Sequence, residues 1–236
     1  YAPVGYYQDV AIRGFPLDLA TGLRMNGMSL TGEQNVALEN KQQVEILKGL
    51  AGIAAGVLSP GGLIDYVTKR PADVRTATLG IDSHGSHYGA VDLGGWLTPH
   101  LGLRFNAAYE DTHSYVQHAD GRRNFYSLSA DWIISDKATL ELDGDYQASA
   151  QRSASGYQLL GGTAIPAHPS RTRLLGFEPW QQPVGIHAAN TVARFNYQFT
   201  ELWRGQLALS HSRSVIDDNV AFAYGCYYAA ACASGA

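Results

Sequence analysis

Residues 101–110 read LGLRFNAAYE, and apolar and polar side chains alternate along them. Leu101, Leu103, Phe105, Ala107 and Tyr109 share one parity, and Arg104, Asn106 and Glu110 share the other. Successive side chains of a β-strand point to opposite faces of the sheet. This stretch therefore predicts a strand with one apolar and one polar face.

The same alternation recurs along the chain from about residue 75. We expect seven strands, at residues 75–82, 87–97, 101–113, 122–134, 138–150, 190–200 and 204–214. In the fifth, Leu140, Leu142, Tyr146 and Ala148 oppose Glu141, Asp143, Asp145 and Gln147. Alternation alone fits a soluble sandwich, whose polar face meets water, and equally a membrane barrel, whose apolar face meets lipid.

The connections between these strands favour the membrane barrel. Tight turns at residues 98–100, 135–138 and 200–203 alternate with longer loops at residues 114–121 and 151–189. Bacterial outer-membrane barrels have short periplasmic turns and longer outer loops. The alternation therefore also predicts which end of the sheet faces outside.

Three of the four tryptophans, Trp96, Trp132 and Trp203, lie close to the tight turns. An aromatic girdle at the membrane interface predicts this clustering, and ordinary packing at strand ends is the alternative. Trp96 has the parity of the polar face. Seven strands would leave two unpaired edges in lipid, which is prohibitively costly, so we expect this sequence to be an internal piece of a larger barrel.

Composition and motifs exclude several functional classes. The chain has 16% charged residues and a net charge of −4, so it offers no cationic surface for nucleic acid. The apolar stretch at residues 49–64 is interrupted by Pro60 and is too short for a membrane-spanning helix. The sequence contains no phosphate-binding GK[ST] motif, no GxSxG and no HExxH, so we expect a protein that is not an enzyme.

The residues before the first expected strand differ in composition, with short apolar runs and many turns, and a domain boundary is expected at residues 71–75. Lys41–Lys48 has a spacing that fits a short helix or a strand. Four motifs follow one another in this part: IRGF at residues 12–15, LRMNGM at 23–28, VEILKG at 44–49 and SPGGLIDYVTKRP at 59–71.

In their order and spacing, these motifs resemble the plug of TonB-dependent outer-membrane receptors, most closely the branch that takes up ferric siderophores, including the ferrichrome type. The resemblance implies a mainly β fold. Residues 1–74 would be the C-terminal part of a small α+β plug, and residues 75–236 the N-terminal part of the transmembrane antiparallel β-barrel around it. About seven of roughly 22 barrel strands would be present, since plugged transporters have barrels of that size.

The resemblance also implies a function. Such a receptor binds a ferric siderophore at its extracellular face and imports it to the periplasm when TonB, an energy-coupling protein of the inner membrane, pulls on the plug. We expect the segment that engages TonB to precede Tyr1, and the barrel to contact outer-membrane lipid. The alternatives are a receptor for another bulky nutrient such as cobalamin or a glycan, a passive porin, and a secreted carbohydrate-binding β-domain.

Arg13 and Lys48 occupy positions at which the resemblance implies plug cations that meet acidic residues of the barrel wall. The family more often has arginine at the second position, and lysine lacks the bidentate fork. We expect their acidic partners in strands beyond Ala236, and we expect Glu45 and Arg70 to pair within the plug. The alternative for both cations is an ordinary solvated charge.

The long loop at residues 151–189 contains Tyr157 and Trp180. Tyr157 is similar in position to aromatic side chains that ferrichrome-type receptors present to the siderophore, so both aromatics are candidate ligand-binding residues, with packing inside the loop as the alternative. The plug loop at residues 31–35 lacks the tyrosine of the ferrichrome type. The identity of the chelator therefore stays open.

Cys226 and Cys232 are expected to form a disulfide in an outer loop, because exported proteins form such bonds and ferrichrome-type receptors carry a more widely spaced pair in a similar place. Two unpaired small side chains are the alternative. Among eight histidines only His84 and His87 lie close together in sequence, so spacing assembles no three-ligand metal site. We expect no cofactor, since the iron would arrive inside its chelator.

Overall fold

A computed structural model of the chain describes residues 5–7, 9–49, 56, 59–154, 163–164, 170–175 and 177–219. Within these ranges the ordered elements are all β-strands. No helix among them is long and apolar enough to cross a membrane. The described residues of the expected plug form strands and turns.

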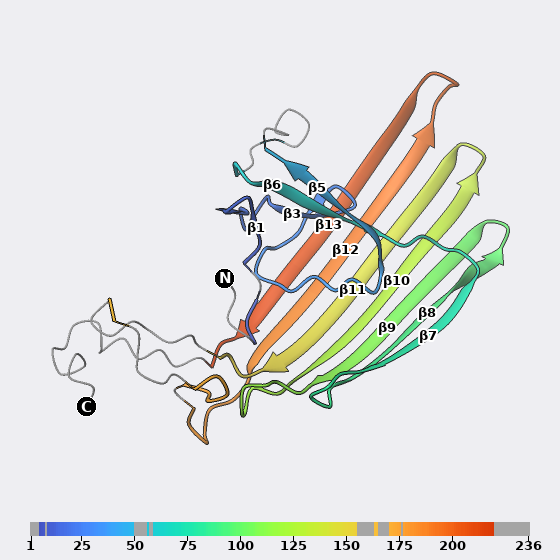
Figure 1. Cartoon of the computed structure of the whole chain (residues 1–236). Coiled ribbons are helices and arrows are strands. Elements are labelled where there is room, and N and C mark those ends of the chain that lie inside the picture. Colours follow the sequence, from blue (N-terminus) through green and yellow to red (C-terminus); the bar gives the residue numbers. More distant parts are fainter. Residues whose placement is uncertain are drawn as a thin grey trace.

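Seven long antiparallel strands form one curved sheet (Figure 1) in the order β13-β12-β11-β10-β9-β8-β7. They are β7 (Val74–Ile81), β8 (His87–Thr98), β9 (Leu101–Thr112), β10 (Gly121–Ser135), β11 (Ala138–Gln151), β12 (Val184–Gln198) and β13 (Arg204–Asp217). All seven expected strands are confirmed. The sixth begins at Val184 rather than at residue 190, because its first residues continue the ladder with β11, from Val184 opposite Gln151.

Each strand joins the next in sequence, and the connections alternate in length. Residues 99–100, 136–137 and 199–203 form the short turns at one end of the sheet, and longer connections lie at the other end (Figure 1). We call the end with the longer connections the outer end, following the usual orientation of bacterial barrels.

The two faces of the sheet differ as the alternation predicts. The face away from the plug exposes apolar side chains along its whole width: Leu79, Ile81, Val91, Leu93, Phe105, Tyr109, Tyr126, Leu128, Trp132, Ile134, Leu142, Tyr146, Leu207 and Leu209. The face toward the plug buries polar side chains such as Asn106, Asp143 and Gln147. A continuous exposed apolar face is what contact with lipid requires.

Trp132 lies on this lipid-facing side, as expected. Trp96 does not, because it keeps the parity of the inner face. A Cβ added at Gly102, its partner on β9, would lie 3.1 Å from the Trp96 ring and 2.7 Å from Pro71. Trp96 therefore packs beside the link between plug and barrel.

The plug lies against the inner face of the sheet (Figure 1). It contains β1 (Ala11–Ile12), β2 (Phe15–Pro16), β3 (Leu23–Met25), β4 (Met28–Ser29), β5 (Lys41–Lys48) and β6 (Gly62–Thr68). Four of these strands form a sheet in the order β4-β3-β6-β5. The stretch whose spacing left helix and strand open is therefore a strand.

Two of the sequence motifs are tight hairpins. Arg13 and Gly14 have φ angles of 55° and 82°, and Asn26 and Gly27 have φ angles of 51° and 81°. Two-residue turns with positive φ at both central positions match the right-handed twist of the flanking strands. The glycine in each motif is required because it adopts this conformation without strain.

The core of the plug is small and reaches the barrel wall. Its buried residues are Ile12, Leu17, Leu23, Met25, Leu30, Ile64, Tyr66 and Val192. Val192 belongs to β12, so one barrel side chain completes the plug core. The other described side-chain contacts between plug and sheet are largely hydrogen bonds and ion pairs.

Candidate ligand cavity and plug docking surface

The most buried ion pair joins the plug to the barrel. Lys41, the first residue of β5, places Nζ 3.1 Å from a carboxylate oxygen of Asp145 on β11, and the two side chains are only 2% and 7% exposed. Lys41 also donates to Asn40 at 2.6 Å. Asp145 accepts further hydrogen bonds from Asn190 at 2.8 Å and from Asn40 at 3.3 Å. Both charges are therefore compensated, as burial requires.

Arg70 makes a second bridge from the plug to the barrel. Its guanidinium contacts Asp131 on β10 and lies 2.7 Å from Asp143 on β11. Asp143 also accepts hydrogen bonds from Asn26, Thr68 and Ser129. The expectation that Arg70 pairs within the plug is wrong, because the inner faces of β10 and β11 present carboxylates to it.

Two further plug–barrel contacts extend this polar surface on both sides. Lys69 lies 2.8 Å from Asp92 on β8, which also pairs with Arg104 at 2.8 Å. Arg194 of β12 donates to the main-chain oxygen of Asn26, in the turn of the second hairpin. We call the plug residues Asn26, Lys41, Thr68, Lys69 and Arg70, with their barrel partners, the docking surface.

Arg13 and Lys48 lie elsewhere. Arg13 is exposed in the turn between β1 and β2, and Lys48 is exposed at the end of β5. Neither makes an ion pair with another of the residues that the structure describes, so their role as contacts with the barrel stays a prediction. Glu45 accepts a hydrogen bond from Gln43 within β5 at 2.5 Å.

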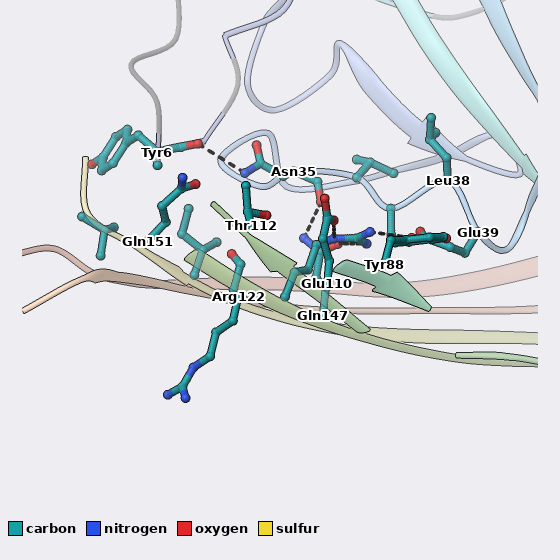
Figure 2. Close-up of a pocket in the computed structure, with 17 residues that line it drawn as sticks. Tyr6, Asn35, Leu38, Glu39, Tyr88, Glu110, Thr112, Arg122, Gln147 and Gln151 are labelled. Carbon is teal, nitrogen blue, oxygen red and sulfur yellow. Dashed lines mark hydrogen bonds and ion pairs between the residues drawn. The ribbon is translucent and has the colours of Figure 1, made fainter. Parts of the chain in front are cut away.

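A cavity of about 610 Å³ lies between the plug and the outer ends of β8 to β12 (Figure 2). Its plug side is formed by Gly5, Tyr6 and residues 35–39. Its barrel side includes Tyr88, Glu110, Thr112, Arg123, Gln147, Ser149, Gln151, Val184 and Ile186. This volume is in the range of small-molecule binding sites.

Arg123 forms ion pairs with two acidic residues that line the cavity. Its guanidinium lies 2.5 Å from Glu39 of the plug and 3.0 Å from Glu110 of β9. Tyr88 also donates to Glu39, at 3.2 Å. Burial opposes ionisation of Glu39, but the hydrogen bond and charge of Arg123 lower the pKa of Glu39 below its ordinary value. Glu39 is therefore a carboxylate at neutral pH.

Glu39→Gln should destabilise the docked plug by about 1–2 kcal/mol at pH 7, because a hydrogen bond between charged groups contributes more than a neutral one. The ordinary pKa of a glutamate is 4.5. Because the pKa of Glu39 is lowered in the folded protein, its ionised form stabilises the fold at pH values above 4.5, and this contribution disappears as the pH falls through the lowered pKa. The difference between wild type and variant should therefore shrink below pH 4.5.

Thermal denaturation of both proteins at neutral and acid pH measures this difference. Glu33→Gln, at an exposed glutamate of the same plug, is the control and should differ little from wild type at either pH. A destabilisation by Glu39→Gln that stays constant with pH would contradict the assigned ion pair.

Of the aromatic residues and cysteines expected in the outer loops, the structure describes Trp180. Trp180 is 69% exposed in the connection before β12 and does not line the cavity, so its contact with ligand stays a prediction. Tyr157, Cys226 and Cys232 lie outside the described residues.

The sequence did not single out Glu39, Tyr88 or Arg123. The alternation did place Glu110 on the polar face, but it did not show that this face meets a plug. In Figure 2 the side chain of Arg122 extends away from the plug, whereas its neighbour Arg123 pairs with Glu39 of the plug.

No family model matches the chain. The chain is 25% identical to the ferripyoverdine receptor of Pseudomonas aeruginosa over 178 residues, which cover 72% of this chain and 21% of that receptor. It is 28% identical to the metal-pseudopaline receptor CntO of the same species over 184 residues, which cover 75% of this chain and 25% of that receptor. The chain thus spans about a fifth to a quarter of the length of these curated relatives.

Solved structures give the same result. BauA, the ferric preacinetobactin receptor from Acinetobacter baumannii, matches with a TM-score of 0.77 and 25% identity, over 90% of this chain and 32% of that chain. The ferric-catecholate import receptor Fiu of E. coli matches with a TM-score of 0.76 and 18% identity, over 90% of this chain and 32% of that chain, which shows the shared fold. The resemblance seen in the sequence is confirmed: this chain is related to the TonB-dependent siderophore receptors and carries plug strands and seven barrel strands of their fold.

Proposed function

We propose that this chain is part of an outer-membrane receptor that binds a ferric siderophore in the cavity at its outer end and imports it into the periplasm. The cavity carries the proposal, because it opens between the plug and the outer ends of the barrel strands. The similar proteins are named for ferripyoverdine, metal-pseudopaline and ferric preacinetobactin. All three names describe a metal held by an organic chelator.

The docking surface supports a plug that moves. If the plug were held by apolar packing, its release would expose apolar surface to water, at a free-energy cost of about 25 cal/mol per Å². Polar groups such as Lys41 and Asp145 can instead exchange their contacts for water. New hydrogen bonds to water offset much of the free energy lost with each hydrogen bond between plug and barrel. A pull by TonB would therefore need less work to release this plug than to release one held by apolar packing.

Transport of an intact chelate requires no catalysis and no resident cofactor. The protein has to recognise the organic shell of the ligand, and the cavity supplies charged, hydroxyl and amide side chains for this, including Tyr88, Arg123 and Gln147. Receptors for cobalamin or a glycan are not favoured, since the relatives are named for metal chelates. A secreted carbohydrate-binding domain is disfavoured by the exposed apolar face.

Binding to the purified full-length protein, tested against a panel of ferric siderophores by fluorescence quenching, examines the proposal. Ser149→Trp should weaken binding of the best ligand at least tenfold, because Ser149 lines the cavity. Ala148→Trp is the matched control, since Ala148 is its neighbour on β11 and faces the other side of the sheet. The proposal fails if no siderophore of the panel binds, or if the two variants bind equally well.

A further inference from the structure

A separate group of side chains lies at the outer end of β8 and β9. His87 is the first residue of β8, Asp111 is near the end of β9, and His113 directly follows that strand. One possible ligand atom from each of the three lies within 4.8 Å of the other two. The group contains two imidazoles and one carboxylate.

The register of the sheet assembles this group on the face away from the cavity. His87 and Asp111 are directly opposed in the antiparallel pairing of β8 and β9. Their neighbours Tyr88 and Glu110 line the cavity, and adjacent side chains of a strand point to opposite faces. His87 and Asp111 therefore point away from the plug. The sequence spacing missed the group because its members are brought together by strand pairing.

Two observations indicate that the group is unsatisfied as it stands. The Nδ1 atom of His113 is buried and has no hydrogen-bond partner among the described residues, and such an atom costs free energy unless a ligand satisfies it. Asp111 makes no ion pair within the described ranges, although Arg122 is its register partner on β10. The carboxylate is therefore available to a cation.

The backbone around the group is held in place. The main-chain N–H of His113 donates to Ser86 Oγ at 2.9 Å, and Ser86 donates through the same hydroxyl to Asp82 at 2.8 Å. The connection between β7 and β8 is thereby tied to the end of β9. His87 is exposed, and its ring lies edge-on to that of His113, with the ring centroids 6.4 Å apart.

We propose that His87, Asp111 and His113 bind a divalent transition-metal ion, with Zn²⁺ the best match. Imidazole nitrogen and carboxylate oxygen are ligands that zinc accepts at about 2.0–2.2 Å, and three protein ligands leave one position for water. Ca²⁺ and Mg²⁺ match poorly because they take oxygen ligands. The ion would clip the connection between β7 and β8 to the start of the next outer loop. The site is separate from the cavity, so it does not depend on siderophore binding.

Equilibrium dialysis of Zn²⁺ against the chelator-treated full-length protein in detergent tests the site. The variants are Asp111→Asn, which nearly keeps the size of the side chain, and His113→Ala. The control is His100→Ala, which removes an exposed histidine from the turn at the other end of the β8–β9 hairpin. Circular dichroism of each variant checks that the barrel is folded, and Asp111→Asn decides the test if His113→Ala does not fold.

Wild type and His100→Ala should bind one Zn²⁺ with the same affinity. Asp111→Asn and His113→Ala should each bind Zn²⁺ about 10–100-fold more weakly or worse. Mutation of a residue that only hydrogen-bonds to a metal ligand already lowers metal affinity by that factor. Co²⁺ added as a probe should give visible absorption bands of a nitrogen–oxygen site in wild type that are lost in His113→Ala. Absence of Zn²⁺ binding by wild type, or equal binding by all four proteins, would overturn the proposal.

Discussion

Lys41→Met should loosen the plug from the barrel wall by about 3–5 kcal/mol, because removal of one partner leaves a buried charge uncompensated. Asp145 is 7% exposed and would keep only the hydrogen bonds from Asn40 and Asn190. A change of this size corresponds to a more than hundredfold shift in the equilibrium between docked and released plug, since about 1.4 kcal/mol is a factor of ten.

Native-state hydrogen exchange of the full-length protein measures this shift, because amide protection reports local opening. Amides of β5 and β6 should exchange more than a hundredfold faster in the variant. Lys137→Met, in the exposed turn between β10 and β11, removes the same charge away from the plug and should leave exchange unchanged.

A double variant separates the buried charge from lost packing. Lys41→Met with Asp145→Leu replaces the pair by apolar groups, and such replacements are often neutral or stabilising. Protection should therefore recover in large part. Exchange of β5 and β6 at the wild-type rate in Lys41→Met alone would show that this ion pair does not hold the plug.

The barrel strands could be predicted from the sequence because alternation is a local property. Leu103, Phe105 and Tyr109 mark the lipid face of β9 without knowledge of any partner strand. The start of β12 was missed, because the residues from Val184 to Ala189 are placed by their pairing with the end of β11. Main-chain pairing with another strand produces no pattern in the sequence of the paired strand.

Only the barrel half of the docking surface could be predicted from the sequence. Alternation placed Asp143 and Asp145 on the polar face, but a polar face facing water and one facing a plug have the same pattern. Their cations, Arg70 and Lys41, are separated from them by 73 and 104 positions in the chain. Composition and spacing carry no information on contacts at that range.

The resemblance implies contacts with the barrel for Arg13 and Lys48, and in the structure Lys41, Lys69 and Arg70 are cations that meet the described barrel strands. The two sets are not exclusive. Arg13 and Lys48 are on exposed parts of the plug, where contact with other barrel strands is still expected. Histidine spacing likewise missed the group around His113, because strand register brings its members together.

The proposed import requires the plug to move relative to the barrel, and a reversible cross-link between plug and barrel tests this movement. Thr31 of the plug and Ser212 of β13 hold their side-chain oxygens 3.2 Å apart, and Thr31 N–H also donates to Ser212 at 2.9 Å. Thr31→Cys with Ser212→Cys therefore brings two thiols close enough for a disulfide, which needs Cβ atoms about 3.5–4.5 Å apart.

Uptake of radiolabelled iron, supplied with the siderophore that binds best, is measured in iron-starved cells that carry only this double-cysteine protein. Each single-cysteine variant, treated with the same oxidant and reductant, is the control. After oxidation the double variant should still bind the siderophore, but its uptake should fall to the level of cells that lack the gene. Reduction of the cross-link should restore uptake. Import at the wild-type rate by fully cross-linked protein would contradict a plug that moves away from this part of the barrel wall.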